Sequence, residues 1–280
     1  MIEWATLDPD DGGPAIQLVP SPDMILGVVD LGWPDARTVT SGRPGSSGEI
    51  DRTVFHGSRA VSVDVKAVHQ PADRSRLIGS CTASRRPTFR FRRVGEQTRR
   101  MSLVGRVASA VMDPRAAPVD DIVCTWSCPS GLVESDLERS KQGTPSSPGQ
   151  GFTYPIVYPV DYGIGGTSGQ LSVTNSGDLP VWPTIRVDGP ATDPKLTNET
   201  TGGVMALSGF TIPAGQYATF DPQTREIYAN GLRDASLLPW LAAGTVWWQL
   251  WPGVSTVRFA PSEWSAPARQ VIRFRDAYTW

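Results

Sequence analysis

Glycine and proline interrupt this chain so often that long regular helices have little room to form. The 280 residues include 28 glycines and 25 prolines, spread along the whole sequence. Because glycine frees the backbone for turns and proline ends helices, such a content favours short strands joined by many turns. With 39% hydrophobic residues the chain can still bury a core, and its length suits two domains of ordinary size. The sequence therefore predicts a mostly β protein of two domains.

The charges nearly balance, which excludes several classes of protein. Lysine and arginine number 26 against 28 acidic residues, a formal net charge of −2, whereas a general nucleic-acid binder tends to be markedly basic. The richest apolar stretch, 237–251, is broken by Pro239, Gly244 and Gln249, so we expect no membrane-spanning helix. The first residues lack a basic start followed by an apolar run, and we expect no secretory signal.

The residues that carry most catalytic chemistry are few. Cys81, Cys124 and Cys128 are too sparse for a disulfide framework and lack zinc-site spacing, so we interpret them as buried free thiols in a protein made in a reducing compartment. His56 and His69 lie beside no nucleophile motif, which favours structural or surface roles. Paired carboxylates remain open as a hydrolytic site, because many pairs are possible and none stands out. The sequence offers no catalytic, cofactor-binding or metal-binding residues, and it indicates a structural or binding protein that is not an enzyme.

Alternation of apolar and polar residues marks strands in the first half. Residues 59–68 place Val61, Val63 and Val65 on one face, which is the period of a half-buried strand. The stretches 88–92, 101–108 and 121–128 alternate in a similar way. Residues 71–83 are the best candidate for a short helix, and a second short helical piece is expected at 132–139.

A polar stretch divides the chain. Residues 140–151 contain no apolar side chain, the composition of a linker. We therefore expect an N-terminal domain at 1–140, a linker at 141–151 and a C-terminal domain at 152–280. Strand candidates about 8–12 residues apart, with turns between them, are typical of a sandwich or barrel. They lie near 153–160, 170–175, 184–188, 203–207, 216–220, 225–229, 245–250, 255–259 and 270–275. Asn230-Gly231 is the strongest turn signal.

Arginine and tryptophan each gather in one part of the chain. Residues 74–106 hold ten arginines against one acid, Glu96, and seven of the ten tryptophans lie at or after Trp182. The planar guanidinium group pairs readily with carboxylates and phosphates. Three interpretations of the arginine stretch therefore stay open: a solvated face, a subunit interface, or contact with nucleic acid.

An ordered series of short motifs fills the second half. The series comprises 173–180 (VTNSGDLP), 182–190 (WPTIRVDGP), 196–202 (LTNETTG), 221–225 (DPQTR), 230–231 (NG), 247–250 (WWQL), 252–253 (PG) and 257–259 (VRF). As an ordered set it resembles the C-terminal domain of phage distal tail proteins, the siphovirus-type minor tail proteins. Upstream, 31–35 (LGWPD) and 51–63 (DRTVFHGSRAVSV) are similar to the N-terminal domain of that family.

The resemblance implies a fold and a function. It implies an N-terminal β-sandwich with a short helix, six copies of which form a ring, followed by a galectin-like or carbohydrate-binding-module-like β-sandwich. Such a ring continues the tube of a long non-contractile tail and carries the adsorption hub or baseplate. The implied partners are other copies of the chain, the tail tube protein, the tape-measure protein and the tail hub. The implied location is the tail tip of the virion, after synthesis in the cytoplasm of the host bacterium.

Two sets of contact residues follow from this resemblance. An alternative function is attachment to host-envelope glycans, for which Trp247 and Trp248 are the expected sugar contacts. An unopposed cationic face would repel its own copies in a homo-oligomer, which favours a subunit interface for the arginines. The expected interface residues are Arg85, Arg86, Arg90, Arg92, Arg93, Arg99 and Arg100. Their expected partners are acids of the next subunit such as Asp30, Asp35, Asp51 or Asp64; contact with DNA in the lumen of the ring is the open alternative.

Overall fold

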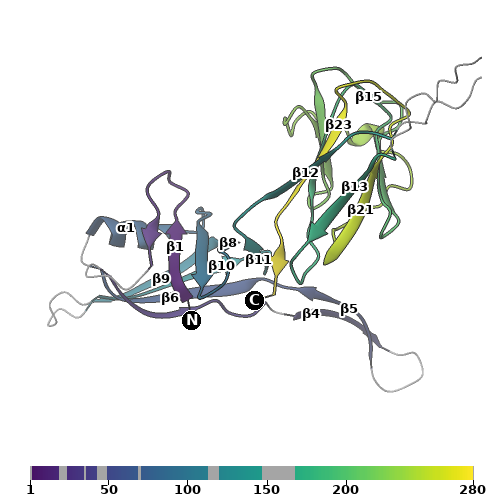
Figure 1. Ribbon diagram of the computed structural model, residues 1–280. Helices are drawn as coiled ribbons and strands as arrows, with labels where there is room; N and C mark the ends of the chain where they lie inside the picture. The colour runs from purple at the N-terminus through teal and green to yellow at the C-terminus, as the bar shows by residue number, and fades with distance from the viewer. Residues whose placement is uncertain are drawn as a thin grey trace, which may run out of the picture. The chain divides into compact units, whose positions relative to one another are not determined.

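The computed structural model describes residues 2–18, 24–34, 36–42, 49–68, 71–112, 120–146 and 168–279. Two compact units form the chain: a first domain of Met1–Asp136 together with Tyr278–Trp280, and a second domain of Leu137–Ala277. Nearly all regular structure in the described residues is antiparallel β-sheet (Figure 1), which confirms the expected fold class. No helix in these ranges is long and apolar enough to cross a membrane.

The regular elements of the first domain are almost all strands. They are β1 Ile2–Asp8, β2 Ile16–Gln17, β3 Met24–Asp30, β4 Ala36–Gly42, β5 Glu49–His56, β6 Arg59–Val68, α1 Pro71–Ser80, β7 Thr88–Arg93, β8 Arg99–Ser102, β9 Val104–Met112, β10 Asp120–Cys128, β11 Val133–Ser135 and, from the far end of the chain, β24 Ala277–Tyr278.

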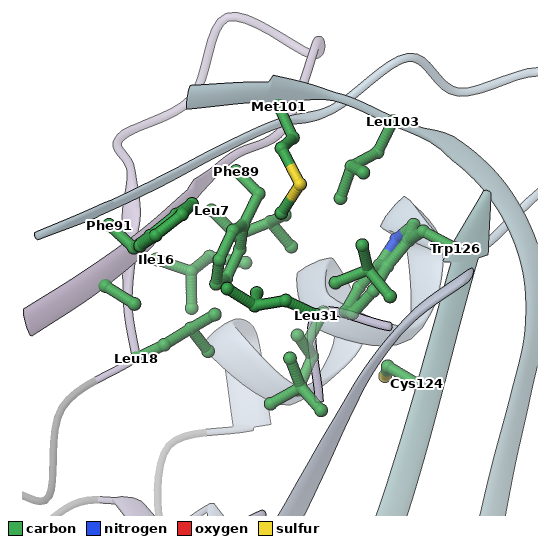
Figure 2. Packing of buried hydrophobic residues seen from close by; sticks show 14 of the residues in the cluster. Leu7, Ile16, Leu18, Leu31, Phe89, Phe91, Met101, Leu103, Cys124 and Trp126 are labelled. Carbon is green, nitrogen blue, oxygen red and sulfur yellow. The ribbon is translucent and has the colours of Figure 1, made fainter. Parts of the chain in front are cut away.

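A sandwich of two sheets encloses the core of the first domain. One sheet has the order β2-β1-β7-β8-β11-β24 and the other has the order β3-β6-β10-β9. Alternate residues of each sheet point inward: Phe89 and Phe91 from β7, Val63 from β6, and Ile122 and Cys124 from β10 are fully buried in one cluster. Figure 2 shows these aromatic rings packed among leucine and isoleucine side chains. The alternation predicted for 59–68, 88–92 and 121–128 is therefore confirmed.

The short helix α1 closes one side of this core. Leu77 is fully buried, and the indole N–H of Trp126 in β10 donates to the carbonyl of Ser80 at 3.2 Å. A Cβ atom at Gly105 would meet the carbonyl oxygen of Thr82 at 2.2 Å, so this strand position must be glycine to let the helix end approach. The helix expected at 71–83 is thus confirmed, with its end at Ser80.

Strands β4 and β5 pair with each other and, among the described residues, with no other strand. Their ladder joins Ala36 to His56 at one end and Gly42 to Glu49 at the other. An isolated two-stranded sheet is marginally stable in water. This hairpin arm therefore lacks the sheet neighbours that support every other long strand of the domain.

The chain returns to the first domain at its far end. Strand β24 is the edge strand of the sheet, beside β11, and Tyr278 packs against the core. The carbonyl of Thr279 accepts a 2.5 Å hydrogen bond from the fully buried guanidinium of Arg59. Burial lowers the pKa of Arg59, so the contact with Thr279 supports a charged group inside the domain.

In its described residues, the second domain consists of short strands and one helical turn. They are β12 Arg139–Gly143, β13 Gln170–Asn175, β14 Thr184–Asp188, β15 Ala191–Thr192, β16 Lys195–Asn198, β17 Gly203–Ala206, β18 Thr211–Ile212, β19 Tyr217–Asp221, β20 Glu226–Ala229, η1 Leu238–Trp240, β21 Gly253–Phe259, β22 Glu263–Trp264 and β23 Arg269–Phe274.

Two larger sheets supply most of the buried hydrophobic side chains among the described residues of the second domain. Their strand orders are β12-β23-β14-β19-β20 and β13-β21-β16-β17, and a small sheet has the order β18-β15-β22. Ile185, Phe220 and Ile272 of the first sheet and Val257 and Phe259 of the second are buried. This arrangement fits the β-sandwich that was expected.

Several predicted elements differ in the structure. Residues 133–135 form β11 rather than a helix, because Val133 and Ser135 are buried on the same side with Glu134 between them. The expected linker at 141–151 begins inside β12, an edge strand whose exposed faces tolerate polar residues. The second domain thus begins at Leu137, and 147–151 lie outside the described residues.

Two strand predictions in the second half also differ. The stretch 245–250 is irregular rather than a strand, and the candidate at 153–160 lies outside the described residues. At the predicted turn, Asn230 and Gly231 have φ values of 50° and 76°, the conformation that an Asn-Gly turn requires. The turn is confirmed, although only an isolated bridge between Tyr228 and Ser236 follows it.

The sandwich of the first domain predicts a large difference between two identical substitutions. Val63 is fully buried, whereas Val94 is 68% exposed in the turn after β7. We expect Val63→Ala to lower the free energy of unfolding by about 2 kcal/mol, because it removes buried methyl groups and leaves a cavity. We expect Val94→Ala to stay within about 0.5 kcal/mol of the parent. Urea denaturation of the full chain measures both; equal effects would contradict the core assignment.

Candidate functional site: a tryptophan-lined groove

Four of the tryptophans line one groove of the second domain. The groove has a volume of about 410 Å³. It is lined by Trp182, Thr201, Gly202, Gly203, Val246, Trp247, Trp248, Gln249 and Trp251. We call this feature the tryptophan groove. One wall is the turn that joins β16 to β17, and the other is the irregular segment 246–251.

Trp248 is the inner, structural member of the groove. Its side chain is 4% exposed, and a Cβ atom added at Gly203 would meet the Trp248 side chain at 2.9 Å. Glycine at 203 therefore lets the indole pack directly against the start of β17. The expectation that Trp248 contacts sugar is at odds with this burial, because a ring without an exposed face cannot stack on a ligand.

Asn198 connects the two walls of the groove. Its side chain is fully buried at the end of β16. The carboxamide oxygen accepts hydrogen bonds from the backbone N–H groups of Thr200 and Thr201 at 3.1 and 3.2 Å. The carboxamide nitrogen donates to the carbonyl of Gln249 at 3.3 Å. One buried amide thus shapes the turn and holds the opposite segment in place.

Asn175 holds the next residue of the segment 246–251, Leu250, in the same way as Asn198 holds Gln249. Its nitrogen donates to the carbonyls of Leu250 and Leu179 at 3.1 and 2.8 Å, and its oxygen accepts from the N–H of Gly177. Leu250 also exchanges two backbone hydrogen bonds with Val181, at 2.9 and 3.0 Å. The segment 246–251 is therefore fixed by side-chain amides and single bridges in place of a strand ladder.

The remaining tryptophans are available to a ligand. Trp251 is 57% exposed and Val246 is 55% exposed, while Trp182 and Trp247 are half-buried. Aromatic walls with a few polar groups, here the side chains of Thr201 and Gln249, are typical of binding sites for small organic ligands. Trp247, an expected sugar contact, lines the groove, and its contact with sugar stays a prediction. Trp251 and Trp182 line the same groove and were not singled out from the sequence.

The predicted interface arginines are paired within the first domain. Arg90 forms ion pairs with Asp8 and, at 2.9 Å, with Asp136. Arg92 binds both carboxylate oxygens of Glu3 at 2.9 Å. Strand pairing explains the contacts with Asp8 and Glu3, because β1 runs beside β7 with Thr6 opposite Arg90 and Trp4 opposite Arg92, so each acid lies one or two residues along from the position opposite its arginine.

The other members of the set have partners as well. Arg85 lies 3.4 Å from Asp10, Arg99 lies 2.9 Å from Glu96, and Arg100 lies 3.9 Å from Glu134. The backbone N–H of Arg86 donates to Asp10 at 2.8 Å, and Arg99 also lies over the ring of Tyr278, 4.3 Å from its centroid. Arg93 is half-buried, and burial lowers its pKa.

These contacts correct the premise behind the interface prediction. The arginines do not form an unopposed cationic face, because acids of the same domain neutralise most of them. Of the partners expected from the next subunit, Asp30 accepts a hydrogen bond from the N–H of Gly32, Asp64 lies in β6 and Asp51 in β5, and Asp35 lies outside the described residues. Whether the same surface also meets another subunit stays a prediction.

The remaining candidates for chemistry offer little. Cys81, Cys124 and Cys128 are free and buried, as expected. Burial raises the pKa of Cys128, which disfavours the nucleophilic thiolate form. His56 lies in β5, and His69 lies outside the described residues. Within the described ranges, no three His, Cys, Asp or Glu side chains are close enough together to hold a metal ion.

Comparison with known proteins points to one family. Residues 176–278 match the family described as "Siphovirus-type tail component, C-terminal domain". No curated protein sequence matches the chain significantly. The fold is similar to the crystal structure of the Dit protein of phage SPP1, at 15% identity, 97% coverage of this chain, 98% of that chain and a TM-score of 0.60.

Two chains of the phage P2 baseplate in its activated conformation are more distant. One, from the structure with Ca, has 9% identity, 98% coverage of both chains and a TM-score of 0.49. The other, from the structure with Sr, has 8% identity, 97% coverage of both chains and a TM-score of 0.47. The family match confirms the resemblance indicated by the motif series, and the SPP1 structure confirms the expected fold.

The pair formed by Arg92 and Glu3 allows a charge-swap test. Both side chains are partly exposed, at 40% and 44%. We expect Arg92→Glu to lower the free energy of unfolding by about 1 kcal/mol, because it places two carboxylates side by side. The double variant E3R/R92E should recover most of this loss in urea denaturation. Arg106→Glu, at an exposed position of β9, controls for net charge. A double variant no more stable than R92E would contradict the pairing.

Proposed function

We propose that this chain, whose residues 176–278 belong to the siphovirus-type tail component family, forms a six-membered ring at the tip of a long non-contractile phage tail. The family match carries the proposal. The solved SPP1 protein, which shares the fold over nearly the whole chain, is described as a paradigm of the hub adsorption apparatus in phages that infect Gram-positive bacteria. In this role the chain joins the tail tube to the adsorption hub or baseplate.

The proposal includes partners and excludes catalysis. The ring would contact the tail tube protein and the tape-measure protein on one side and the tail hub on the other, after synthesis in the host cytoplasm. A joining ring needs stable surfaces and no reactive groups, so we propose that the chain is not an enzyme. The burial of Cys81, Cys124 and Cys128 and the lack of a catalytic motif in the sequence are consistent with this role.

The hairpin arm supports assembly with other copies. Strands β4 and β5 have no further sheet partner among the described residues, and such a hairpin gains stability when another surface covers it. A closed ring needs a heterologous contact, in which one surface of each subunit meets a different surface of the next. The arm is an element that can reach a neighbouring subunit without disturbing the sandwich of its own domain.

Shortening the hairpin arm tests ring formation. Residues 37–55 can be replaced by a short Gly-Ser turn, because Ala36 and His56 are paired neighbours at the base of the hairpin. We expect the full chain to form rings of six in native mass spectrometry and negative-stain microscopy. The shortened chain should remain folded by circular dichroism but stay monomeric.

Two outcomes would contradict this picture. Six-membered rings formed by the shortened chain would show that the arm is not needed. A strictly monomeric full chain at high concentration, combined with its absence from purified virions, would rule out the ring. A chain with Arg233→Gln serves as the matched control, because this exposed side chain of the second domain lies outside both the arm and the expected arginine interface.

The tryptophan groove favours a second function, attachment to glycans of the host envelope. Sugar rings present an apolar face that packs on exposed aromatic side chains, and their hydroxyl groups bond to polar neighbours. Trp251 offers the most exposed ring in the groove, at 57%. A ring protein can carry such a site on its second domain, so the two functions are compatible.

Glycan binding is tested by a pair of tryptophan variants. We expect Trp251→Ala to weaken binding in a glycan array or a cell-wall pull-down by roughly tenfold, as for the loss of about 1.4 kcal/mol of stacking. Trp240→Ala should have no effect, because Trp240 is 39% exposed but lies outside the groove. Equal binding by both variants and the parent would exclude the groove. Trp248→Ala is not informative, because loss of this buried ring would also destabilise the domain.

A further inference from the structure

A compact charged cluster in the second domain lies outside both the tryptophan groove and the hairpin arm. Arg186 and Asp188 are two residues apart in β14, so their side chains lie on the same face of the sheet. Arg269 in β23 stands directly opposite Asp188 on one side, and Tyr217 in β19 stands opposite on the other. Strand pairing alone thus brings two guanidinium groups, a carboxylate and a phenol ring together.

Asp188 holds both arginines by the same kind of contact. The Nε–H of Arg186 donates to one carboxylate oxygen at 2.5 Å, and the Nε–H of Arg269 donates to the other at 2.7 Å. Burial by itself raises the pKa of Asp188, but the hydrogen bonds from Arg269 and Arg186 outweigh it and hold the pKa below its usual value. Asp188 therefore stays ionised and fixes the position of both guanidinium groups.

The cluster keeps a positive charge and unused donors. Arg186 also lies over the ring of Tyr217, 3.7 Å from its centroid, which limits its freedom to turn away. Each arginine donates from Nε to Asp188. Among the described residues of the second domain, the Nη nitrogens of the two arginines make no other hydrogen bond. The two side chains are 39% and 51% exposed. Two cations against one anion leave one positive charge that faces solvent.

This charge lines a pocket of about 260 Å³. The walls are the two arginines with Asp188, Gly189, Gly215, Gln216 and Pro267. The glycines add no side chain, so a small ligand can reach the guanidinium groups. The volume is below that of typical sites for drug-sized ligands, and it suits a single charged group with a small body.

We propose that this pocket binds an oxyanion, a phosphate or a carboxylate, carried by a body no larger than one sugar unit. A guanidinium group is weakly hydrated and presents its N–H donors in a planar fork that matches the two oxygens of such a group. The arginines touch the ligand, whereas Asp188 is a positioning residue that acts through them. The site shares no lining residue with the tryptophan groove.

Titration of the full chain tests this site. The probes are inorganic phosphate, glucose 1-phosphate and glucuronate, with glucose as the neutral control, all at pH 7 and constant ionic strength. Isothermal titration calorimetry should show saturable binding of at least one oxyanion at one site per chain, and no binding of glucose. Tighter binding of the phosphates or of glucuronate identifies which oxyanion the pocket prefers.

Two variants separate a shaped site from general positive charge. R186K/R269K keeps both charges and both partners of Asp188, so the domain should fold, but it lacks the forked donors. Its affinity should fall by about tenfold, the effect of losing charge-assisted hydrogen bonds. Arg233→Gln is the matched control, because Arg233 is 61% exposed in the same domain and pairs with Glu226 and Asp221 away from the pocket. Failure of every oxyanion to bind, or unchanged affinity in R186K/R269K, would overturn the proposal.

Discussion

The tryptophan groove of the second domain depends on the hydrogen bonds of two buried asparagine side chains. The segment 246–251 has no strand ladder, yet its carbonyl groups lie against a packed interior where unpaired polar atoms are costly. Asn198 and Asn175 supply the missing donors to Gln249 and Leu250. Because the same amides also shape the turns beside β16 and β13, the backbone around the tryptophans is fixed from both sides. Aromatic rings can then be displayed on an irregular segment without making that segment loose.

The charged side chains of the first domain also find their partners within the same domain. The acidic residues at 8–11 and the basic residues at 76–90 are far apart in sequence, but they meet because β1 pairs with β7. Exposed ion pairs contribute little stability individually. Their larger effect is to remove a like-charge repulsion that a symmetric assembly would otherwise face. In the proposed ring, contacts between subunits would therefore rely on shape and apolar burial, with limited sensitivity to salt.

The pattern of neighbouring residues in the sequence predicted most strands and the helix. The predictions that differ from the structure concern features that depend on contacts between distant parts of the chain. The alternation around Val63 and Phe89 and the Asn230-Gly231 turn are properties of a few neighbouring residues, and they appear as expected. Residues 140–143 looked like linker because an edge strand needs no apolar side chains. Trp247 and Trp248 looked equivalent, since nothing in their order shows that Gly203 makes room for only one of them. Arg269 contacts Asp188 across 81 residues of sequence. No short motif therefore reveals the cluster that these two residues form with Arg186.

The place of β24 has a consequence for synthesis on the ribosome. The sheet that begins with β2 and β1 is completed by residues 277–278, so the first domain cannot finish folding until the intervening Leu137–Ala277 unit has been translated. At elongation rates of about 5–20 residues per second this interval is on the order of ten seconds. During that time the outer side of β11 is an open strand edge, a template for wrong pairing with other nascent chains. Closely spaced ribosomes on one messenger RNA would then favour wrong pairing between neighbouring nascent chains. Less frequent initiation of translation would space the ribosomes further apart and favour a soluble product.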